Sequence, residues 1–225
     1  MPYHTQFLKL IIVLAMVMLP LGLGSNVSYL ISTMIRKKTI GFNLLGMVLS
    51  YGLIVILVWF AGYKEVFFFK KATLYFYLFA PFIGITCIGI EYLAGVIINF
   101  VSSGKWVFKI SIHSSYSRVE KIKKFDILMI VLFAVIEELL YRQVLVNLLQ
   151  INFNISEISL ILVSSIVFAF NHINFGAFAA FQKLFSGLIF TCIYLLSGYS
   201  ILVPAIAHAS QNLSLLFASR AGEFK

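Results

Sequence analysis

Residues 127–142 read ILMIVLFAVIEELLYR, ten apolar residues followed by two adjacent carboxylates and, four residues after the second, a guanidinium. The carboxylates Glu137 and Glu138 lie about 16 Å along a helix from its polar start at Asp126, at a rise of about 1.5 Å per residue. A charge at the middle of a bilayer costs about 2.5–3.5 kcal/mol on insertion scales. Three charges at that depth therefore need a structural or chemical reason.

The composition of the whole chain predicts a membrane environment. Of its 225 residues, 61% are hydrophobic and 11% are charged, and the mean hydropathy is +1.02. A soluble domain has about 45–50% apolar and about 25% charged residues, so the bilayer must be the solvent. Cys87 and Cys192 both lie in apolar runs, which argues against a disulfide framework or a cysteine-based zinc site.

The apolar runs predict an all-α fold, a polytopic transmembrane bundle of seven helices, with eight as the alternative. A helix needs about 20 apolar residues to cross the hydrocarbon core. The expected spans are 10–35, 43–63, 72–101, 127–149, 158–173, 176–197 and 200–218. Pro20 predicts a kink in the first span, which we expect to be retained, and Pro81 allows a break in the third. Residues 1–225 are expected to form a single membrane domain whose motif-bearing core covers about 125–218.

The net charge of +9 lies mainly in short loops between the apolar runs. Topology and anionic lipid explain this charge better than nucleic acid does. With seven spans and an external N-terminus, eleven cations face the cytoplasm, and the four outside are Lys9, Lys64, Lys70 and Lys71. The positive-inside rule therefore predicts an N-out, C-in chain. Abundant Ile, Phe, Lys and Asn indicate an AT-rich bacterial genome, so the expected location is a bacterial plasma membrane.

Two further apolar segments carry polar residues at helical spacing. Phe168 lies one turn before His172, so that the ring can brace the imidazole, and His208 lies one turn before Asn212. Taken alone, each pair is explained by helix capping or by interhelical hydrogen bonds, which contribute about 0.6–2 kcal/mol. Counted with the charged cluster at 137–142, they indicate an assembled site to which three helices each contribute polar side chains.

The charged side chains divide into different expected tasks. Glu138 and Arg142 lie on one helix face and can pair, which leaves Glu137, about 100° around the helix, free for other chemistry. A structural ion pair alone does not explain Glu137. We expect Glu91 to be a packing or counter-ion residue, and Lys183 to snorkel to the cytoplasmic interface.

The three polar stretches resemble the motifs of the CAAX-protease and bacteriocin-processing family of intramembrane peptidases, which are Glu-Glu-x-x-x-Arg, Phe-x-x-x-His and His-x-x-x-Asn. They read here as Glu137–Arg142, Phe168–His172 and His208–Asn212, in the family's order. Each motif alone is weakly specific, but all three in order, each on its own apolar helix, form a strong signal. The resemblance implies an intramembrane endopeptidase.

The resemblance also implies a division of roles. Glu137 is expected to be the general base that takes a proton from water, with His172 holding and polarising that water. His208 and Asn212 are expected to stabilise the oxyanion of the tetrahedral intermediate. The ion pair of the first motif is expected to hold its helix in register.

The cofactor prediction rests on Glu137, His172 and His208, which are acceptable zinc ligands. The sequence lacks His-Glu-x-x-His, the helix signature of zinc peptidases. A divalent metal such as zinc therefore stays open, and we favour the metal-free glutamate mechanism that the resemblance also allows.

The expected partners are the lipid bilayer and a peptide or membrane-protein substrate, with no nucleic acid and no prediction of oligomeric state. The resemblance allows processing of a bacteriocin or signalling peptide, self-immunity to such a peptide, or prenylated-protein cleavage, and we favour the peptide roles. Two other classes remain. One is a non-proteolytic membrane regulator of a partner protein, and the other is a proton-coupled transporter that uses Glu91, Glu137 and the histidines as a relay.

Overall fold

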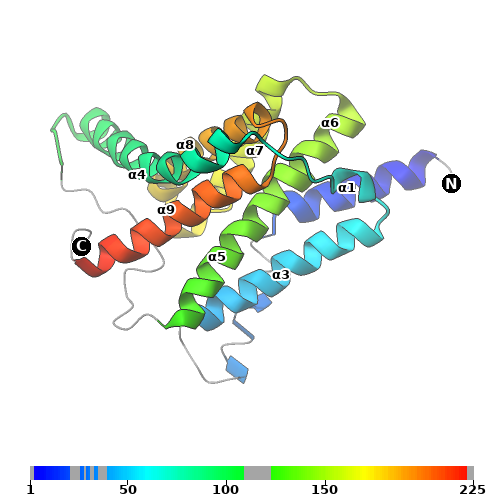
Figure 1. The fold of residues 1–225 in the computed structure, drawn as a ribbon, viewed down its shortest axis with the longest axis horizontal. Coiled ribbons are helices and arrows are strands. Elements are labelled where there is room, and N and C mark those ends of the chain that lie inside the picture. The colour runs from blue at the N-terminus through cyan, green and yellow to red at the C-terminus, as the bar shows by residue number, and fades with distance from the viewer. Residues whose placement is uncertain are drawn as a thin grey trace.

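The computed structural model describes residues 3–20, 26–27, 29–30, 33–34, 40–108 and 123–221. Every regular element in these ranges is helical (Figure 1), which confirms the all-α prediction. The α-helices are α1 Tyr3–Met18, α3 Ile40–Phe60, α4 Leu74–Ser103, α5 Lys124–Glu138, α6 Asn147–Phe153, α7 Glu157–Phe170, α8 Ala177–Leu196 and α9 Leu202–Ala221. The short helices are η1 Lys64–Val66, η2 Leu139–Val146 and η3 Ile173–Phe175. The backbone stays helical from α5 through η2 into α6, so the described ranges contain seven helical rods.

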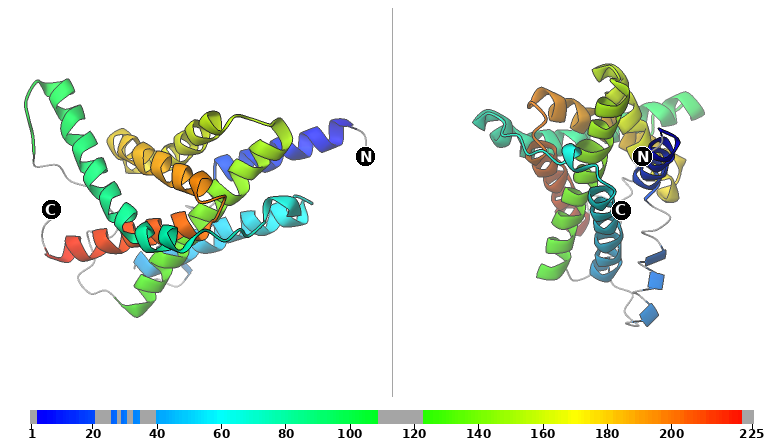
Figure 2. Two further views of the ribbon diagram at one scale, coloured as in Figure 1. Left: turned by 45° about the horizontal axis from the view of Figure 1, so that its top comes forward. Right: turned by 90° about the vertical axis from the view of Figure 1, so that its right-hand side faces the viewer.

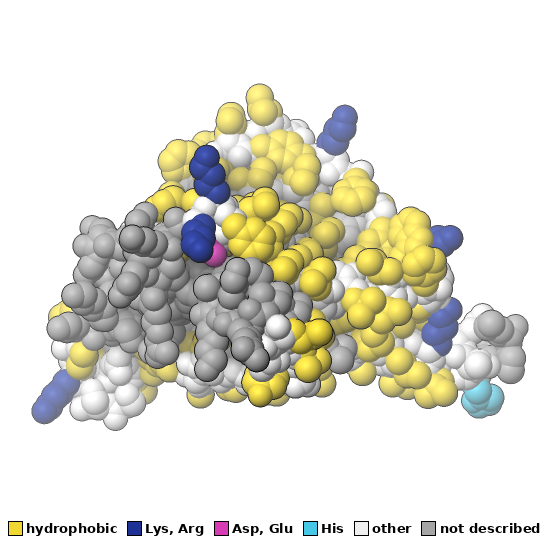
Figure 3. Space-filling model, turned by 90° about the horizontal axis from the view of Figure 1, so that it is seen from below, with side chains coloured by type: hydrophobic (Ala, Val, Ile, Leu, Met, Phe, Trp, Pro, Cys, Tyr) yellow, Lys and Arg dark blue, Asp and Glu magenta, His cyan; other side chains and the backbone are white. Residues whose placement is uncertain are grey.

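The helices have the lengths and surfaces of a membrane protein. Three described segments are long and apolar enough to cross a bilayer, namely Asn43–Phe60, Leu74–Ser103 and Ala177–Leu196. Outward-facing apolar side chains are common, and Phe60 and Ile158 are 80% and 72% exposed. Figure 3 shows hydrophobic side chains over much of one face, with few lysines and arginines among them. So large an apolar surface is expected against lipid and not against water.

Two details of the predicted spans are wrong, and both concern prolines. The first span does not begin at residue 10 or kink at Pro20, because α1 begins at Tyr3 and ends at Met18. Proline lacks the N–H of the helix ladder and disfavours helical backbone in the residue before it. Most of 21–35 lies outside the described residues. The third span is not broken, since α4 continues through Pro81, as neighbouring helices in membrane proteins often permit.

The rod formed by α5, η2 and α6 lies at the centre of the bundle. It packs against α3 and α9 along α5, and against α1 and α7 at η2, and Figure 1 shows it running diagonally through the molecule. The closest remaining pairs are α4 with α9 and α7 with α8. Helices α4 and α9 cross in their N-terminal halves, and their C-terminal ends diverge (Figure 2, left). The central rod carries the first motif, and the helices of the other two motifs, α7 and α9, both pack against it.

Two glycines allow the closest helix contacts. A Cβ added at Gly84 in α4 would lie 2.0 Å from the carbonyl oxygen of Ala207 in α9. A Cβ added at Gly187 in α8 would lie 3.0 Å from the Cα atom of Ser165 in α7. Small residues are typical of helix interfaces in membranes, where close van der Waals packing drives association. Gly84 therefore sets the distance between α4 and the helix that carries the third motif.

We predict that Gly84→Ala lowers stability, because the new methyl group collides with backbone that can move only if α9 moves. The expected loss is about 1–3 kcal/mol, measured as a lower Tm in detergent and lower accumulation in the membrane. Gly89→Ala is the matched control on the same helix, because a Cβ there has nothing within 4 Å and alanine favours a helix over glycine. An equal Tm for the two variants contradicts the α4–α9 contact.

Candidate active site

The three motifs lie on α5 with η2, at the end of α7, and on α9. Glu137 and Glu138 are the last two residues of α5, His172 follows α7, and His208 lies in the second turn of α9. Their contacts with one another, described below, join side chains from three separate rods. The sequence prediction that these motifs form one cluster therefore agrees with the geometry.

The helix changes type at the site, directly after Glu138. Residues Leu139–Val146 form a π-helix of eight residues, and all of them except Leu139 are buried. A π-helix has i to i+5 hydrogen bonds, is rare, and is frequently found at functional sites. Hydrophobic periodicity gives no signal for this change, so sequence reasoning missed it.

Glu138 is the polar hub of the site. Its Oε1 accepts a hydrogen bond from Arg142 Nη1 at 3.0 Å and lies 2.7 Å from His208 Nδ1. All three side chains are buried. Because an ionised carboxylate only accepts hydrogen bonds, Nδ1 of His208 carries the hydrogen of this contact. The predicted Glu138–Arg142 pair is thus present, and the contact with His208 is an addition that the sequence did not indicate.

Glu137 lies beside the same histidine but is not hydrogen-bonded to it. Its Oε2 is 3.7 Å from His208 Nε2, which is too long for a hydrogen bond. Glu137 is only 3% exposed, and its carboxylate makes no hydrogen bond with another described residue. The two adjacent glutamates therefore differ in their contacts. The carboxylate of Glu138 is bonded to two partners, and that of Glu137 makes no hydrogen bond within the described part of the chain.

Phe168 is the apolar hub. Its ring centroid lies 4.7 Å from that of His172 and 5.8 Å from that of His208, and the Arg142 guanidinium lies 4.6 Å from it. The backbone carbonyl of Phe168 is 2.8 Å from His172 Nδ1. Because a carbonyl only accepts, Nδ1 donates and Nε2 of His172 keeps its lone pair. The expected brace for His172 is present, and the same ring also supports two residues of the other motifs.

Arg142 ties the central rod to α8. Its Nη2 donates to the backbone carbonyl of Gly187 at 3.2 Å, and Phe190 approaches the guanidinium from a second side at 5.7 Å. The side chain is fully buried, so its charge has only Glu138, one carbonyl and two aromatic faces to replace water. Asn212, one turn after His208, is 7% exposed. Its side-chain amide has no hydrogen-bond partner among the described residues.

Two expectations outside the motifs have different outcomes. Glu91 has the counter-ion role that the sequence predicts, because Lys183 Nζ lies 2.8 Å from its Oε1. The snorkelling of Lys183 is wrong, since its ammonium turns to Glu91 on α4 and its side chain is only 14% exposed. A buried carboxylate within reach gives the ammonium a stronger partner than a distant interface does. The sequence showed an acid and a base at membrane depth but did not indicate that the two helices place them together.

The three candidate metal ligands do not form a metal site in this arrangement. Among the described residues there is no group of three His, Cys, Asp or Glu side chains placed to hold a metal ion. The Nδ1 atom of His208 is bonded to Glu138 and that of His172 to a carbonyl, which leaves Nε2 of each ring without a hydrogen bond to a described residue.

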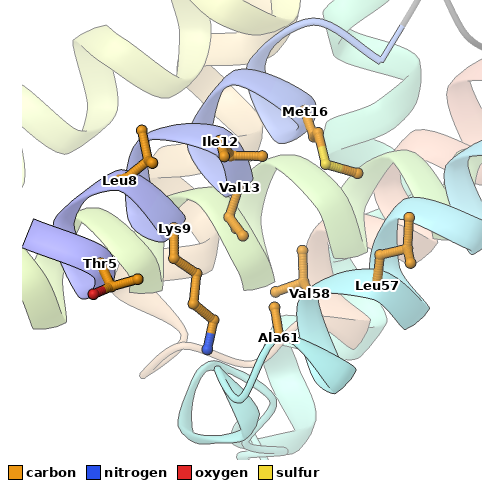
Figure 4. A pocket seen from close by; sticks show the side chains of 9 residues that line it. All are labelled: Thr5, Leu8, Lys9, Ile12, Val13, Met16, Leu57, Val58 and Ala61. Atoms are coloured by element: carbon orange, nitrogen blue, oxygen red, sulfur yellow. The ribbon is translucent and has the colours of Figure 1, made fainter. Parts of the chain in front are cut away.

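A separate hollow lies between α1 and α3, away from the motif residues. It has a volume of about 400 Å³, and Figure 4 shows apolar side chains around it, with Lys9 at one end. None of its lining residues belongs to a motif. The described residues that line it include one lysine and no acid or histidine.

Comparison with known proteins supports the same region. Residues 124–214 match a family model described as "Type II CAAX prenyl endopeptidase Rce1-like". No curated protein and no solved structure gave a match. The matched segment begins at the start of α5 and ends two residues beyond Asn212, so it contains all three motifs. The match therefore agrees with the resemblance of the three motifs to CAAX proteases, which are hydrolases.

Proposed function

We propose that the protein is an intramembrane endopeptidase that cleaves a peptide bond in a peptide or a membrane-associated protein. The observation that carries the proposal is the position of His208, bonded to Glu138 on one side and facing the uncommitted carboxylate of Glu137 on the other. A base beside a fixed imidazole, in a buried cluster, is the arrangement that hydrolysis by an activated water requires. The favoured role is maturation of a bacteriocin or signalling peptide, or self-immunity to one.

Glu137 acts as the general base in this mechanism. It removes a proton from water, whose oxygen attacks the carbonyl carbon of the scissile bond, and it returns a proton to the departing amine. His172 holds and polarises the water through Nε2, because its Nδ1 is bonded to the Phe168 carbonyl. A positioned acid–base group of this kind contributes about 10²–10⁴-fold in rate.

His208 and Asn212 stabilise the oxyanion. The Nδ1–H of His208 is used by Glu138, so the ring can donate from Nε2 only when both nitrogens carry hydrogen. Asn212 adds a neutral amide donor. One such donor is worth about 2.7–4 kcal/mol of transition-state stabilisation. Glu138 and Arg142 do not touch the substrate and hold His208 and the π-helix in place.

The proposed mechanism uses no metal, because a carboxylate base and an imidazole can together activate water. A relay for proton transport has less support, because Glu91 is bonded to Lys183, Ser186 and Gln211 and is not free to exchange protons with Glu137. The protein is proposed to lie in a bacterial plasma membrane with its N-terminus outside, its C-terminus inside and its site open to the cytoplasm. That orientation gives the enzyme access to peptides made inside the cell.

We predict that Glu137→Gln, His172→Ala and His208→Ala each abolish processing while the protein still accumulates in the membrane. Each change removes a group that acts on water or the oxyanion and leaves the Glu138–Arg142 pair intact. Peptides encoded by neighbouring genes are the substrates to test, with cleavage read by mass spectrometry. Wild-type processing in one variant removes that residue from the mechanism. A wild-type phenotype of the cells carrying each of the three variants, with no cleavage detected, favours a non-proteolytic regulator.

The same assay tests the metal. A zinc chelator is expected to leave the rate of the purified wild-type protein unchanged. Loss of activity with the chelator, followed by recovery with added zinc, contradicts the metal-free mechanism while leaving the protease assignment in place.

We predict that Arg142→Ala lowers abundance as well as activity. It leaves Glu138 buried with His208 as its one remaining partner, and breaking a buried pair costs about 3–5 kcal/mol. Glu138→Gln combined with Arg142→Gln replaces two buried charges by two amides that can bond, so abundance is expected to recover. Normal accumulation of Arg142→Ala with activity alone lost means that Arg142 touches the substrate.

Orientation is tested with single cysteines in a protein that lacks Cys87 and Cys192. Cysteines at 36–38 and 118–124 are expected to resist a membrane-impermeant maleimide in intact cells, and cysteines at 64–70 are expected to react. Positions 36–38 and 118–122 lie outside the described residues, so the expectation for them rests on charge alone. Labelling of 118–124 from outside inverts the bundle and excludes cytoplasmic access.

A further inference from the structure

A second buried polar cluster lies on α4, α8 and α9, outside the three motifs. Both oxygens of Glu91 are bonded to Lys183 Nζ, at 2.8 and 3.1 Å. Its Oε1 also accepts hydrogen bonds from the hydroxyl of Ser186 and, at 3.0 Å, from Gln211 Nε2. Gln182 Nε2 donates to the backbone carbonyl of Glu91 at 3.0 Å. We call Glu91, Lys183, Ser186 and Gln211 the Glu91 network.

The Glu91 network joins three helices through buried polar groups, and burying such groups costs free energy. Glu91, Ser186 and Gln211 are fully buried, and an acid in the hydrocarbon core is costly unless it is paired. Apolar side chains of the same volume often pack as well as a buried ion pair or better. Such a pair does something that apolar packing cannot do, because its hydrogen bonds fix the rotation and depth of a helix and not only its distance from a neighbour.

The network reaches the candidate active site at two points. On α9, Gln211 lies between His208 and Asn212, three residues after the first and directly before the second. On α8, Ser186 precedes Gly187, whose carbonyl accepts the hydrogen bond of Arg142. Each end of the network is therefore anchored next to a group on which the site depends.

The α4–α9 contact alone leaves the rotation of α9 undefined. Where the two helices cross, Gly84 meets the backbone of Ala207 without a polar side chain. One turn further along α9, Gln211 is bonded both to Glu91 and to the Ser186 hydroxyl, at 3.0 and 3.1 Å. A turn of α9 about its axis breaks these bonds and moves every α9 side chain of the site at the same time.

We infer that the Glu91 network is a positioning device for the peptidase, with Gln211 as the residue that sets the rotation of His208 and Asn212. The inference rests on the proposed function, and it assigns to Glu91, Lys183 and Gln211 a role that none of the three motifs contains. None of these residues touches the reacting atoms. They act by holding two oxyanion donors where charge develops, so their loss lowers kcat and leaves KM in place.

The first test compares Gln211→Leu with Ser210→Ala. The leucine keeps the volume and removes the amide, and a displacement of about 1 Å at reacting groups lowers the rate about 100-fold. We expect kcat per folded molecule to fall to that extent with KM unchanged, since the lost interaction is made in the transition state. Ser210 neighbours Gln211 on α9 and belongs to neither cluster, so Ser210→Ala is expected to keep wild-type kcat. Wild-type kcat in Gln211→Leu overturns the inference.

Rescue separates positioning from simple loss of folding. Lys183→Met leaves Glu91 without its cation and is expected to lower kcat. Glu91→Lys combined with Lys183→Glu reverses the ion pair, and the amide oxygen of Gln211, which has no partner among the described residues, can accept from the ammonium now at position 91. The double variant is expected to recover most of the lost kcat. Failure of the double variant to exceed Lys183→Met, at equal abundance, contradicts the inference.

A further measurement does not depend on catalysis. Asn212→Cys is placed in a protein without Cys87 and Cys192, and its maleimide reaction rate in detergent is measured with and without Lys183→Met. The position is 7% exposed, so a rotation of α9 is expected to change the rate severalfold, and the reversed ion pair is expected to restore it. An unchanged rate overturns the positioning role. An active Glu137→Gln overturns the proposed function instead and leaves this measurement valid.

Discussion

The site depends on a single oxygen atom, Oε1 of Glu138, which accepts from both Arg142 and His208. This atom joins the central rod to α9. The second terminal nitrogen of the Arg142 guanidinium, Nη2, joins the same rod to α8 through the Gly187 carbonyl. In water such contacts are weak because solvent competes for every donor. Inside the bundle these groups are shielded from solvent, so each lost contact leaves a buried polar group unpaired, and the arrangement is correspondingly rigid.

The membrane explains why the two buried ion pairs lie in the interior of the bundle. A bilayer offers no partner to a charge, and two of the buried acids are paired with a base, Glu138 with Arg142 and Glu91 with Lys183. The apolar surface around them provides no rotational register, because lipid and leucine are equally apolar. The register of the helices therefore has to come from the few hydrogen bonds in the interior. In this protein the two clusters lie next to each other on α8, where Ser186 belongs to one and Gly187 to the other.

The sequence was sufficient for local features and insufficient for contacts between helices. The apolar runs predicted the helices. The spacing of four residues predicted the Glu138–Arg142 pair and the Phe168–His172 contact. The pairing of Glu91 with Lys183 could not be deduced, because the residues are 92 positions apart and periodicity does not say which helix faces meet. The π-helix after Glu138 was not visible either, since the side chains of Leu139–Val146 suit an α-helix equally well. Pro20 ended a helix and Pro81 did not, a difference that depends on the neighbours of each proline.

The two adjacent glutamates show how tertiary contacts, and not residue type, divide the work of a site. Glu137 and Glu138 are chemically identical, but they are adjacent in the helix and so point in different directions. The Glu138 carboxylate reaches Arg142, and the Glu137 carboxylate lies near Nε2 of His208. A carboxylate that already accepts two hydrogen bonds has little capacity to take a proton from water without releasing a partner. The uncommitted carboxylate has that capacity, and the committed one holds the imidazole that faces it. The spacing of four residues places Arg142 beside Glu138, so Glu138 is the glutamate that is held and the Glu137 carboxylate stays without a hydrogen bond to a described residue.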